Sequence, residues 1–161
     1  MCRTARILLP GGSVVLVDDS DIDMLSHWSW YLTPSGYVTA THRGSRVRVR
    51  MNRLLVLPDR TQEVDHINGD LLDNRRRNLR VCTHRQNIQN THVVRGLSRF
   101  KGVHQRSSGR WRAMITVEGR RVHLGNFSRE AAAAAAYDRA AIEYFGTFAW
   151  TNFPHSKRRT S

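Results

Sequence analysis

Four polar residues near the middle of the chain have types and spacing that could hydrolyse a phosphodiester bond. Asp65 and His66 are adjacent, and Asn78 and Asn87 follow them. This reaction needs a base that deprotonates water and a cation that neutralises charge on the phosphate and the leaving oxygen. Histidine titrates near neutral pH and suits the first role. Carboxylate and amide oxygens suit a hard ion, so Asp65 and Asn87 are expected to bind Mg²⁺ (or Mn²⁺) and to be a poor zinc site.

The elements that must position these residues are expected to be a strand, a loop, a second strand and a helix. A strand over residues 63–66 runs into the turn signal at Asn68-Gly69, and residues 79–81 form the second strand. Thr83 begins the helix, because Gln86 follows it at the spacing of a capping box. A distorted end of the first strand could then present the carboxylate and the imidazole to one phosphate. The remaining polar residues of the loop are expected to shape it and not to bind metal: Asp70, Asp73 and Asn74.

This segment resembles the HNH endonuclease motif, in the form found in phage and intron homing endonucleases. The resemblance implies a ββα-metal nuclease domain in which His66 is the general base and Asp65 and Asn87 ligate the metal. It also implies that Asn78 holds the loop through backbone hydrogen bonds, and that the products carry 5′-phosphate and 3′-hydroxyl ends. The chain departs from the pattern at Asn87, where many relatives have His, and at Asn52, where relatives often have His.

Residues 1–60 are expected to form a small α+β region that leads into the motif, which occupies residues 61–92. Pro10-Gly11-Gly12 is a turn signal between two apolar runs, and Pro58 ends a short apolar helix. The expected elements are, in chain order, strands at 7–9 and 13–19, a helix at 21–30 capped by Asp18, Ser20 or Asp21, a strand at 37–41 and a helix at 51–57.

Arginine and valine alternate strictly between positions 46 and 50. In a strand this pattern places Arg46, Arg48 and Arg50 on one face and the two valines on the other. Like charges at this spacing repel each other unless an anion lies across them, which favours a face that contacts phosphates. An ordinary half-exposed strand is the alternative interpretation.

Residues 99–154 are expected to form a second unit, after a linker at 93–98 and before a basic tail at 155–161. Three strands separated by two glycine-bearing turns predict an antiparallel meander. Ser128 is expected to cap a long, alanine-rich helix that ends at Gly146. The whole chain is therefore expected to be α+β, with this unit a three-stranded antiparallel sheet packed on one helix. The expected core residues of the unit are Trp111, Phe127, Ile142 and Phe145.

The second unit resembles the plant ethylene-response-factor (APETALA-type) DNA-binding domain. The matching segments include Lys101-Gly102-Val103, Trp111, Leu124 to Phe127, Ala134 to Asp138 and Asn152-Phe153-Pro154. The resemblance implies a sheet in the major groove of double-stranded DNA with the helix behind it, and phage nucleases of this kind carry such a domain at the C-terminus. The implied DNA-contact positions are Lys101, His104, Arg106, Thr116, Arg121, His123 and Asn126, with Arg112 as a further candidate and Gly102 as a site of close backbone approach.

The chain of 161 residues is strongly basic, with 26 Lys and Arg against 13 Asp and Glu and a formal net charge of +13. All the basic residues except Lys101 and Lys157 are arginine, whose planar guanidinium suits phosphates and guanine edges. This charge favours nucleic acid as the partner, with an acidic membrane surface or a merely solvated surface as weaker alternatives. Residues 95–161 carry more of the net positive charge than residues 1–94, which favours the second unit as the DNA-binding part.

Cysteine and hydropathy patterns suggest a location. Cys2 and Cys82 have neither metal-ligand spacing nor the pattern of a disulfide framework. No apolar run approaches the ~20 residues of a membrane helix, and the N-terminus is a poor signal peptide. We therefore expect a soluble, cytoplasmic, monomeric protein with no protein partner, in a bacterial host if the gene is phage-borne.

Three functions fit these patterns. A DNA endonuclease of the homing or phage type explains why Asp65, His66 and Asn87 are all intact. A non-catalytic DNA-binding regulator is the second hypothesis, although a decayed site need not retain these residues. An RNA-binding protein is the third, because basic charge does not distinguish RNA from DNA. His84 either contacts phosphate or simply lies near the start of the helix.

Overall fold

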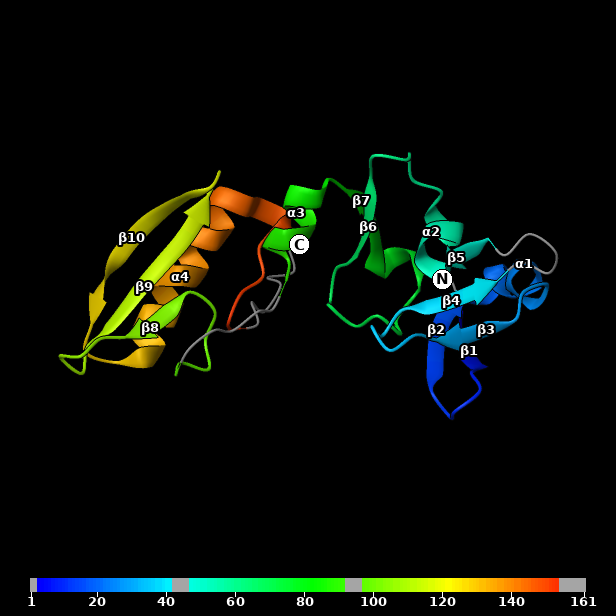
Figure 1. Cartoon of the computed structure of the whole chain (residues 1–161), viewed down its shortest axis with the longest axis horizontal. Helices are drawn as coiled ribbons and strands as arrows, with labels where there is room; N and C mark the ends of the chain where they lie inside the picture. Colours follow the sequence, from blue (N-terminus) through cyan, green and yellow to red (C-terminus); the bar gives the residue numbers. More distant parts are fainter. Residues whose placement is uncertain (1–2, 42–46, 92–96, 154–161) are drawn as a thin grey trace. The chain divides into compact units, whose positions relative to one another are not determined.

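The computed structural model describes residues 3–41, 47–91 and 97–153, and it contains helices and antiparallel sheets in both halves of the chain (Figure 1). The expected α+β class is thus confirmed. Residues 1–87 form one compact unit and residues 88–161 form another, so their boundary lies within a helix, ahead of the linker expected at 93–98. Most of that linker and most of the basic tail lie outside the described residues. Within the described ranges, no helix is long and apolar enough to cross a membrane.

The first unit consists of short strands and helices joined by tight turns. The strand at 63–66 and the helix after Thr83 lie where they were expected. The elements are β1 (Thr4–Leu8), β2 (Val14–Asp18), the 3₁₀ turn η1 (Asp19–Asp21), α1 (Ile22–Ser26), β3 (Trp30–Leu32), β4 (Val38–Thr41), β5 (Arg48–Arg50), α2 (Met51–Val56), β6 (Glu63–His66), η2 (Arg76–Asn78), β7 (Leu79–Cys82) and α3 (His84–Gln89), whose last residues belong to the second unit.

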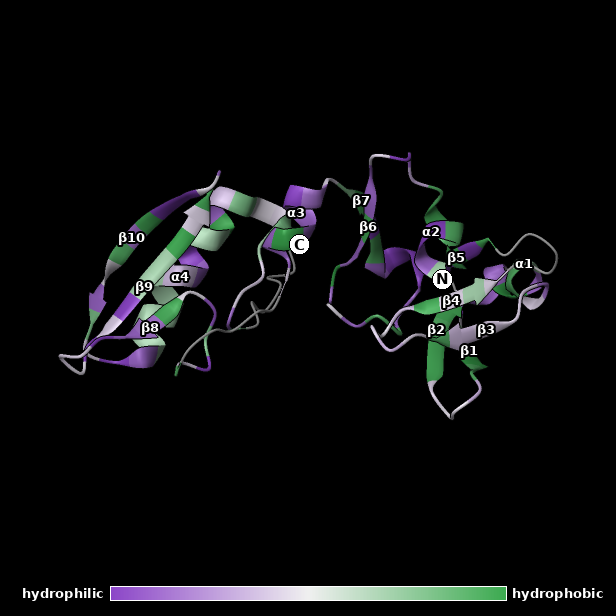
Figure 2. Ribbon diagram, in the orientation of Figure 1, coloured by the Kyte–Doolittle hydropathy of each residue, from purple (hydrophilic) through white to green (hydrophobic). Residues whose placement is uncertain are grey.

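One hydrophobic core runs through the first unit. β1 pairs with β2, β4 lies between β3 and β5, and β6 pairs with β7, all antiparallel. Val15 of β2 is fully buried in one cluster with Leu25 of α1 and Met51 of α2. The hydrophobic character of β2 shows as green in Figure 2. Val64 and Leu79 of the β6–β7 pair belong to the same cluster. The first 60 residues therefore support the β6–β7 pair directly and share its core.

The helix expected over residues 21–30 is shorter than expected, and its supposed caps have another role. α1 ends before Trp30, which already belongs to β3. The carboxylate of Asp18 accepts the backbone N–H of Arg76 at 2.9 Å, and that of Asp21 accepts the Arg76 guanidinium at 2.8 Å. Neither carboxylate caps a helix with its side chain. For Asp21, the guanidinium of Arg76, distant in sequence, is a stronger partner than a helix terminus, whereas Asp18 takes a single backbone N–H of the motif.

The second unit is the expected antiparallel meander, with a long helix packed against its sheet (Figure 1). β9 is the central strand, and a bulge after His123 shifts the register of β10 so that Gly125 pairs with Ala113. The elements are β8 (Val103–Gln105), β9 (Trp111–Val117), β10 (Arg120–Phe127), α4 (Glu130–Phe145) and the 3₁₀ turn η3 (Gly146–Phe148).

The start of α4 differs from the expectation, whereas its end does not. Arg129 is the N-cap residue in place of Ser128, and it makes no side-chain cap hydrogen bond. Glu130 in the first turn accepts the hydroxyl of Ser98 at 2.8 Å and the backbone N–H of Arg99 at 3.3 Å. Its charge also suits the positive end of the helix dipole. The helix stops at Gly146 as expected.

Small side chains form the interface between α4 and the sheet. Ala133, Ala134 and Ala141 are fully buried, and Tyr137 is buried beside them. The expectation that Ile142 belongs to the core is wrong, because the side chain is 39% exposed. Position 142 follows the buried stripe by one residue and so turns about 100° away from it. The other expected core residues pack partly buried against this core: Trp111, Phe127 and Phe145.

Gly102 is required by packing inside the second unit. Its φ is +74°, and a Cβ placed there would collide with the ring of Tyr137 and lie 2.7 Å from the carbonyl oxygen of Met114. The close backbone approach expected at Gly102 is therefore made to Tyr137.

Replacing Gly102 with alanine is expected to destabilise the second unit by about 2–5 kcal/mol, because overpacking adds to the strain of a left-handed backbone. Gly109→Ala is the matched control, since Gly109 has φ +76° but open space around its Cβ position. That control is expected to cost only about 1–2 kcal/mol. Urea unfolding, followed through NMR signals of β9 and α4, measures both losses. Equal losses in the two variants would contradict this account of Gly102.

Candidate functional site

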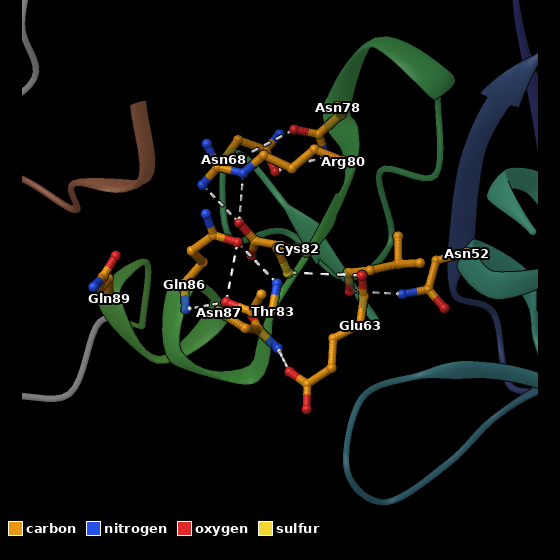
Figure 3. A network of polar contacts seen from close by, with 12 residues as sticks. Asn52, Glu63, Asn68, Asn78, Arg80, Cys82, Thr83, Gln86, Asn87 and Gln89 are labelled. Atoms are coloured by element: carbon orange, nitrogen blue, oxygen red, sulfur yellow. Dashed lines mark hydrogen bonds and ion pairs between the residues drawn. The ribbon is translucent and has the colours of Figure 1, made fainter. Parts of the chain in front are cut away.

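Asn78 fixes the loop between β6 and β7 (Figure 3). Its Oδ1 accepts the backbone N–H of Asn68 at 3.0 Å. Its Nδ2 donates to Asn68 Oδ1 at 2.9 Å and to the backbone carbonyl of Asp73 at 2.7 Å. Asn78 is buried, so these bonds replace water that it would otherwise bind. The structure thus shows the loop-holding hydrogen bonds expected of this residue.

The acidic residues of the same loop form hydrogen bonds within it and so stabilise its conformation. Asp70 accepts the backbone N–H of Leu72 at 2.9 Å. Asp73 pairs with Arg75 at 2.6 Å, and this hydrogen-bonded ion pair lowers the pKa of the Asp73 carboxyl group. Both roles agree with the expectation that these carboxylates shape the loop.

His66 ends β6 and is only 3% exposed. Its Nε2 lies 3.3 Å from Oδ1 of Asn74. Burial lowers the pKa of His66, so the imidazole is neutral and can accept a proton near neutral pH. Pairing with β7 stays regular through His66, so the distorted strand end that was expected is not found here. Asp65 and His66 therefore project from opposite faces of β6.

Asp65 is held by Arg80, which lies directly opposite it on β7. The Arg80 guanidinium donates to Oδ2 of Asp65 from Nε at 2.8 Å and from a terminal nitrogen at 2.6 Å. Asp65 is 5% exposed, so a cation, and not bulk water, compensates this buried carboxylate. A metal ion bound to Asp65 would share the carboxylate with Arg80 or displace it.

Asn87 lies one turn into α3, and α3 begins with the expected capping box. The N–H of Thr83 donates to Gln86 Oε1 at 2.8 Å, and the N–H of Gln86 donates to Thr83 Oγ1 at 3.3 Å. Nδ2 of Asn87 donates to Glu63 at 2.6 Å (Figure 3). The other Glu63 oxygen lies 2.8 Å from Nδ1 of His84. Both hydrogen bonds lower the pKa of Glu63, and the one from Asn87 has the larger effect. The amide nitrogen thus faces Glu63, and the amide oxygen is the atom turned away from it.

The donor set suits a hard divalent ion better than zinc. Asp65 offers a carboxylate oxygen and Asn87 an amide oxygen, which leaves places for water and phosphate oxygens, as Mg²⁺ prefers. In the part of the chain that the structure describes, no three His, Cys, Asp or Glu side chains gather into a metal site. Burial raises the pKa of the Cys82 thiol to about 11, which keeps it protonated and a poor ligand.

A cavity of about 440 Å³ lies beside the start of α3. Its walls include Arg50, Arg53 and Arg60 together with Asn87. The one carboxylate in its lining belongs to Glu63, which is hydrogen-bonded to His84 and Asn87. Because three arginines face this single carboxylate, the cavity carries excess positive charge. Such a cavity suits a phosphate-bearing strand that passes next to Asn87.

Asn52 also lines this cavity, but its side chain is buried and joins two elements. Its Nδ2 donates to the carbonyl of Val64 at 3.3 Å, and its Oδ1 accepts the N–H of Arg53 at 2.9 Å. Asn52 therefore attaches α2 to β6.

The alternating arginines behave as expected where the structure describes them. Arg48 and Arg50 are exposed on one face of β5, whereas Val49 is half-buried. The Arg50 guanidinium lies 3.9 Å from the centroid of the Tyr37 ring, at the cavity described above. Arg46 lies outside the described residues.

The face of the second sheet opposite α4, here called the outer face, carries most of the expected DNA contacts. Ala113 and Ile115 of β9 are buried in the core with α4, so alternation places their neighbours in β9 on the outer face. The cross-strand register then places the corresponding residues of β8 and β10 beside them. The outer face thus carries His104, Arg112, Thr116, Arg121, His123 and Asn126, and the exposed Arg106 follows β8.

Lys101 serves the fold of the second unit. Its Nζ donates to the carbonyl oxygens of Gln89 at 2.8 Å and Thr91 at 2.7 Å. Its backbone N–H donates to Oδ1 of Asn152 at 2.7 Å. Burial lowers the pKa of Lys101 to about 8. The DNA contact expected at Lys101 is therefore not available while these bonds hold.

Three residues that position the site or stabilise the fold were not predicted from the sequence: Glu63, Arg80 and Asp138. Glu63 carried a signal, because it stands two residues before Asp65 and so shares a strand face with it. Arg80 carried none, since its partner depends on the β6–β7 register. Asp138 is a buried acid in an alanine-rich helix, and it accepts the backbone N–H groups of Asn152 at 2.8 Å and Phe153 at 2.9 Å.

Comparison with known proteins agrees with this geometry. A family profile described as HNH endonuclease matches residues 57–89. An uncharacterized HNH endonuclease of Acanthamoeba polyphaga mimivirus is 31% identical over 144 residues, which is 88% of this chain and 75% of that protein. An AP2/ERF and B3 domain-containing protein of Oryza sativa subsp. japonica is 38% identical over 128 residues, which is 78% of this chain but 33% of the rice protein. APETALA2-like protein 2 of Oryza sativa subsp. indica is 48% identical over 67 residues, 40% of this chain and 15% of that protein.

The strand–loop–strand–helix frame that carries His66, Asp65 and Asn87 lies within the segment matched by the HNH endonuclease profile. The chain belongs to the HNH endonuclease family, whose members generally use a divalent metal ion. It is also similar, over part of its length, to plant AP2/ERF proteins, of which it spans a third or less.

The stability of the second unit is expected to rise with pH between about 8 and 10.5 because of Lys101. Its folded-state pKa of about 8 lies below the ordinary lysine value of 10.5, so the unfolded chain binds more protons in this window. Lys101→Met is expected to remove this pH dependence. The difference in unfolding free energy between the wild type and the variant cancels the contributions of the other titrating groups. Urea unfolding at several pH values, followed by NMR signals of α4, measures it. Parallel pH curves for the two proteins would rule this out.

Proposed function

We propose that this protein is a DNA endonuclease that cuts with one divalent metal ion, Mg²⁺ or Mn²⁺, and a histidine base. The observation that carries the proposal is the frame itself: Asn78 ties down the loop that follows His66, and Glu63 links the strand of Asp65 to the helix of Asn87. We propose that this arrangement is a ββα-metal nuclease domain. A homing or phage nuclease acting in the cytoplasm of its host is the setting that we propose.

The residues of the site divide the chemistry between them. His66 takes the proton of the attacking water, whose oxygen then bonds to phosphorus as the bond from phosphorus to the 3′ oxygen breaks. The 3′ oxygen leaves with the bonding electrons and takes a proton from solvent, which gives 5′-phosphate and 3′-hydroxyl ends. Asp65 and Asn87 would hold the metal ion, which supplies positive charge for the phosphate and the leaving oxygen.

DNA is held, in this proposal, by two basic surfaces. The outer face of the second sheet would enter the major groove, where arginine and histidine side chains reach base edges and phosphates. Arg112 supports this assignment by its place at the centre of the outer face, where it lies between His104 of β8 and Asn126 of β10. In the first unit, the DNA strand that is cut would lie along Arg48 and Arg50 and pass through the cavity beside α3. A monomer acting on double-stranded DNA is sufficient for this arrangement.

A non-catalytic DNA-binding regulator is the second candidate. The observation that favours it is the ion pair between Arg80 and Asp65, which already neutralises the carboxylate. The two candidates differ in whether the protein cuts DNA when a divalent ion is supplied.

Cleavage is tested on supercoiled plasmid with Mg²⁺ or Mn²⁺. The protein is expected to nick or linearise the plasmid, and His66→Ala is expected to lower the rate about 10²- to 10⁴-fold, because the base is lost. Asp65→Ala and Asn87→Ala are expected to lower cleavage far more than they lower binding measured in EDTA. Asp70→Ala is the matched control, since it removes a loop carboxylate that bonds only a backbone N–H in the described loop. A wild-type protein that binds DNA but cuts it with neither ion would favour the regulator.

Binding by the outer face is tested with Arg121→Ala, and the matched control is Arg139→Ala on α4. Both arginines are exposed and both changes remove one positive charge. Arg121→Ala is expected to weaken DNA binding and to reduce the slope of log K against log salt by ~0.9 if one phosphate contact is lost. Arg139→Ala is expected to leave both nearly unchanged. Equal effects of the two substitutions, measured by filter binding over a salt series, would mean that net charge alone attracts the DNA.

A further inference from the structure

Asn74 is a buried amide with no role in the chemistry described so far. It is 1% exposed and lies in the loop between β6 and β7. Its backbone N–H donates to the carbonyl of Leu16 in β2 at 2.8 Å. The position of this residue is therefore set by the core of the first unit.

The orientation of the Asn74 amide is determined by its other partner. Nδ2 donates to the backbone carbonyl of Leu71 at 3.0 Å. A carbonyl oxygen can only accept a hydrogen bond, so the nitrogen end of the amide must face Leu71. The oxygen end, Oδ1, is then the atom that lies 3.3 Å from Nε2 of His66.

This orientation decides which nitrogen of His66 carries the proton. Oδ1 of Asn74 cannot donate, so Nε2 must carry the hydrogen that lies between them. In a neutral imidazole Nδ1 then holds the lone pair. The opposite tautomer would set two buried acceptors against each other, and neither could then form this hydrogen bond.

We propose that Asn74 is a positioning residue that holds His66 in the Nε2–H tautomer and so makes Nδ1 its basic nitrogen. That Nδ1 receives the proton of the attacking water rests on the proposed function; the tautomer itself does not.

The tautomer can be observed directly in the metal-free protein without DNA. Long-range ¹H–¹⁵N correlation spectra at alkaline pH show which ring nitrogen is protonated, and His66→Gln assigns the signals. The wild-type protein is expected to show a single tautomer with the proton on Nε2. A proton on Nδ1 would overturn the proposal, whether or not the protein cuts DNA.

Three variants separate positioning from loop stability. Asn74→Ala is expected to lose the protected Nε2–H signal and to show averaging of the two tautomers. Asn74→Asp loses the bond to Leu71 but keeps an acceptor, so it is expected to keep the Nε2–H tautomer. Asp70→Ala removes a different loop hydrogen bond and is expected to leave the His66 tautomer unchanged. A His66 tautomer that stays fixed in Asn74→Ala would also overturn the proposal.

Activity provides a second, independent readout if the protein cuts DNA. Asn74→Ala is expected to lower kcat about 10- to 100-fold with little change in KM, because the base is misplaced while DNA binding is intact. A loss in KM alone would contradict a positioning role. Absence of cleavage by the wild type together with the expected tautomer would refute the proposed function and leave the role of Asn74 standing.

Discussion

The loop between β6 and β7 carries the site, and hydrogen bonds from buried polar groups hold it in place. Asn78 binds the loop from within, through Asn68 and Asp73. The same loop is attached to β2, since Leu16 donates to the carbonyl of Leu72 at 2.9 Å and accepts from Asn74 at 2.8 Å. A buried polar network is costly when incomplete, so a loop conformation that satisfies every group is strongly favoured over one that does not. The placement of His66 and Asp65 depends on this network.

Arginine has two different roles in the chain. Arg76 and Arg80 lie within the first unit and bond to Asp21 and Asp65, where they stabilise buried carboxylates. Arg50 and Arg121 are exposed on strands and are positioned to meet a polyanion. Net charge counts both kinds equally, although only the second kind attracts DNA at long range. The basic composition therefore overstates the charge that is available for binding.

Two asparagine amides of the site are oriented in the same way. Asn87 turns its nitrogen to Glu63, and Asn74 turns its nitrogen to the carbonyl of Leu71. The oxygen of Asn74 then faces His66, and in the proposed function the oxygen of Asn87 would bind the metal ion. Both partners can only accept a hydrogen bond, so each fixes the orientation of its amide; the partner of Asn74 is a neutral carbonyl, whereas that of Asn87 is a carboxylate.

The sequence by itself determined the local features of this protein. The strand–loop–strand–helix order, the capping box at Thr83, the meander and the stop at Gly146 were all predicted, because each depends on residues close together in the chain. The tertiary structure decided the partners of charged and small residues. Asp21 was expected to cap a helix but binds Arg76, and Gly102 was expected at DNA but packs on Tyr137. A carboxylate takes the strongest donor that the fold brings to it, and a glycine is required wherever a distant ring packs closely, so neither role can be read from neighbouring residues.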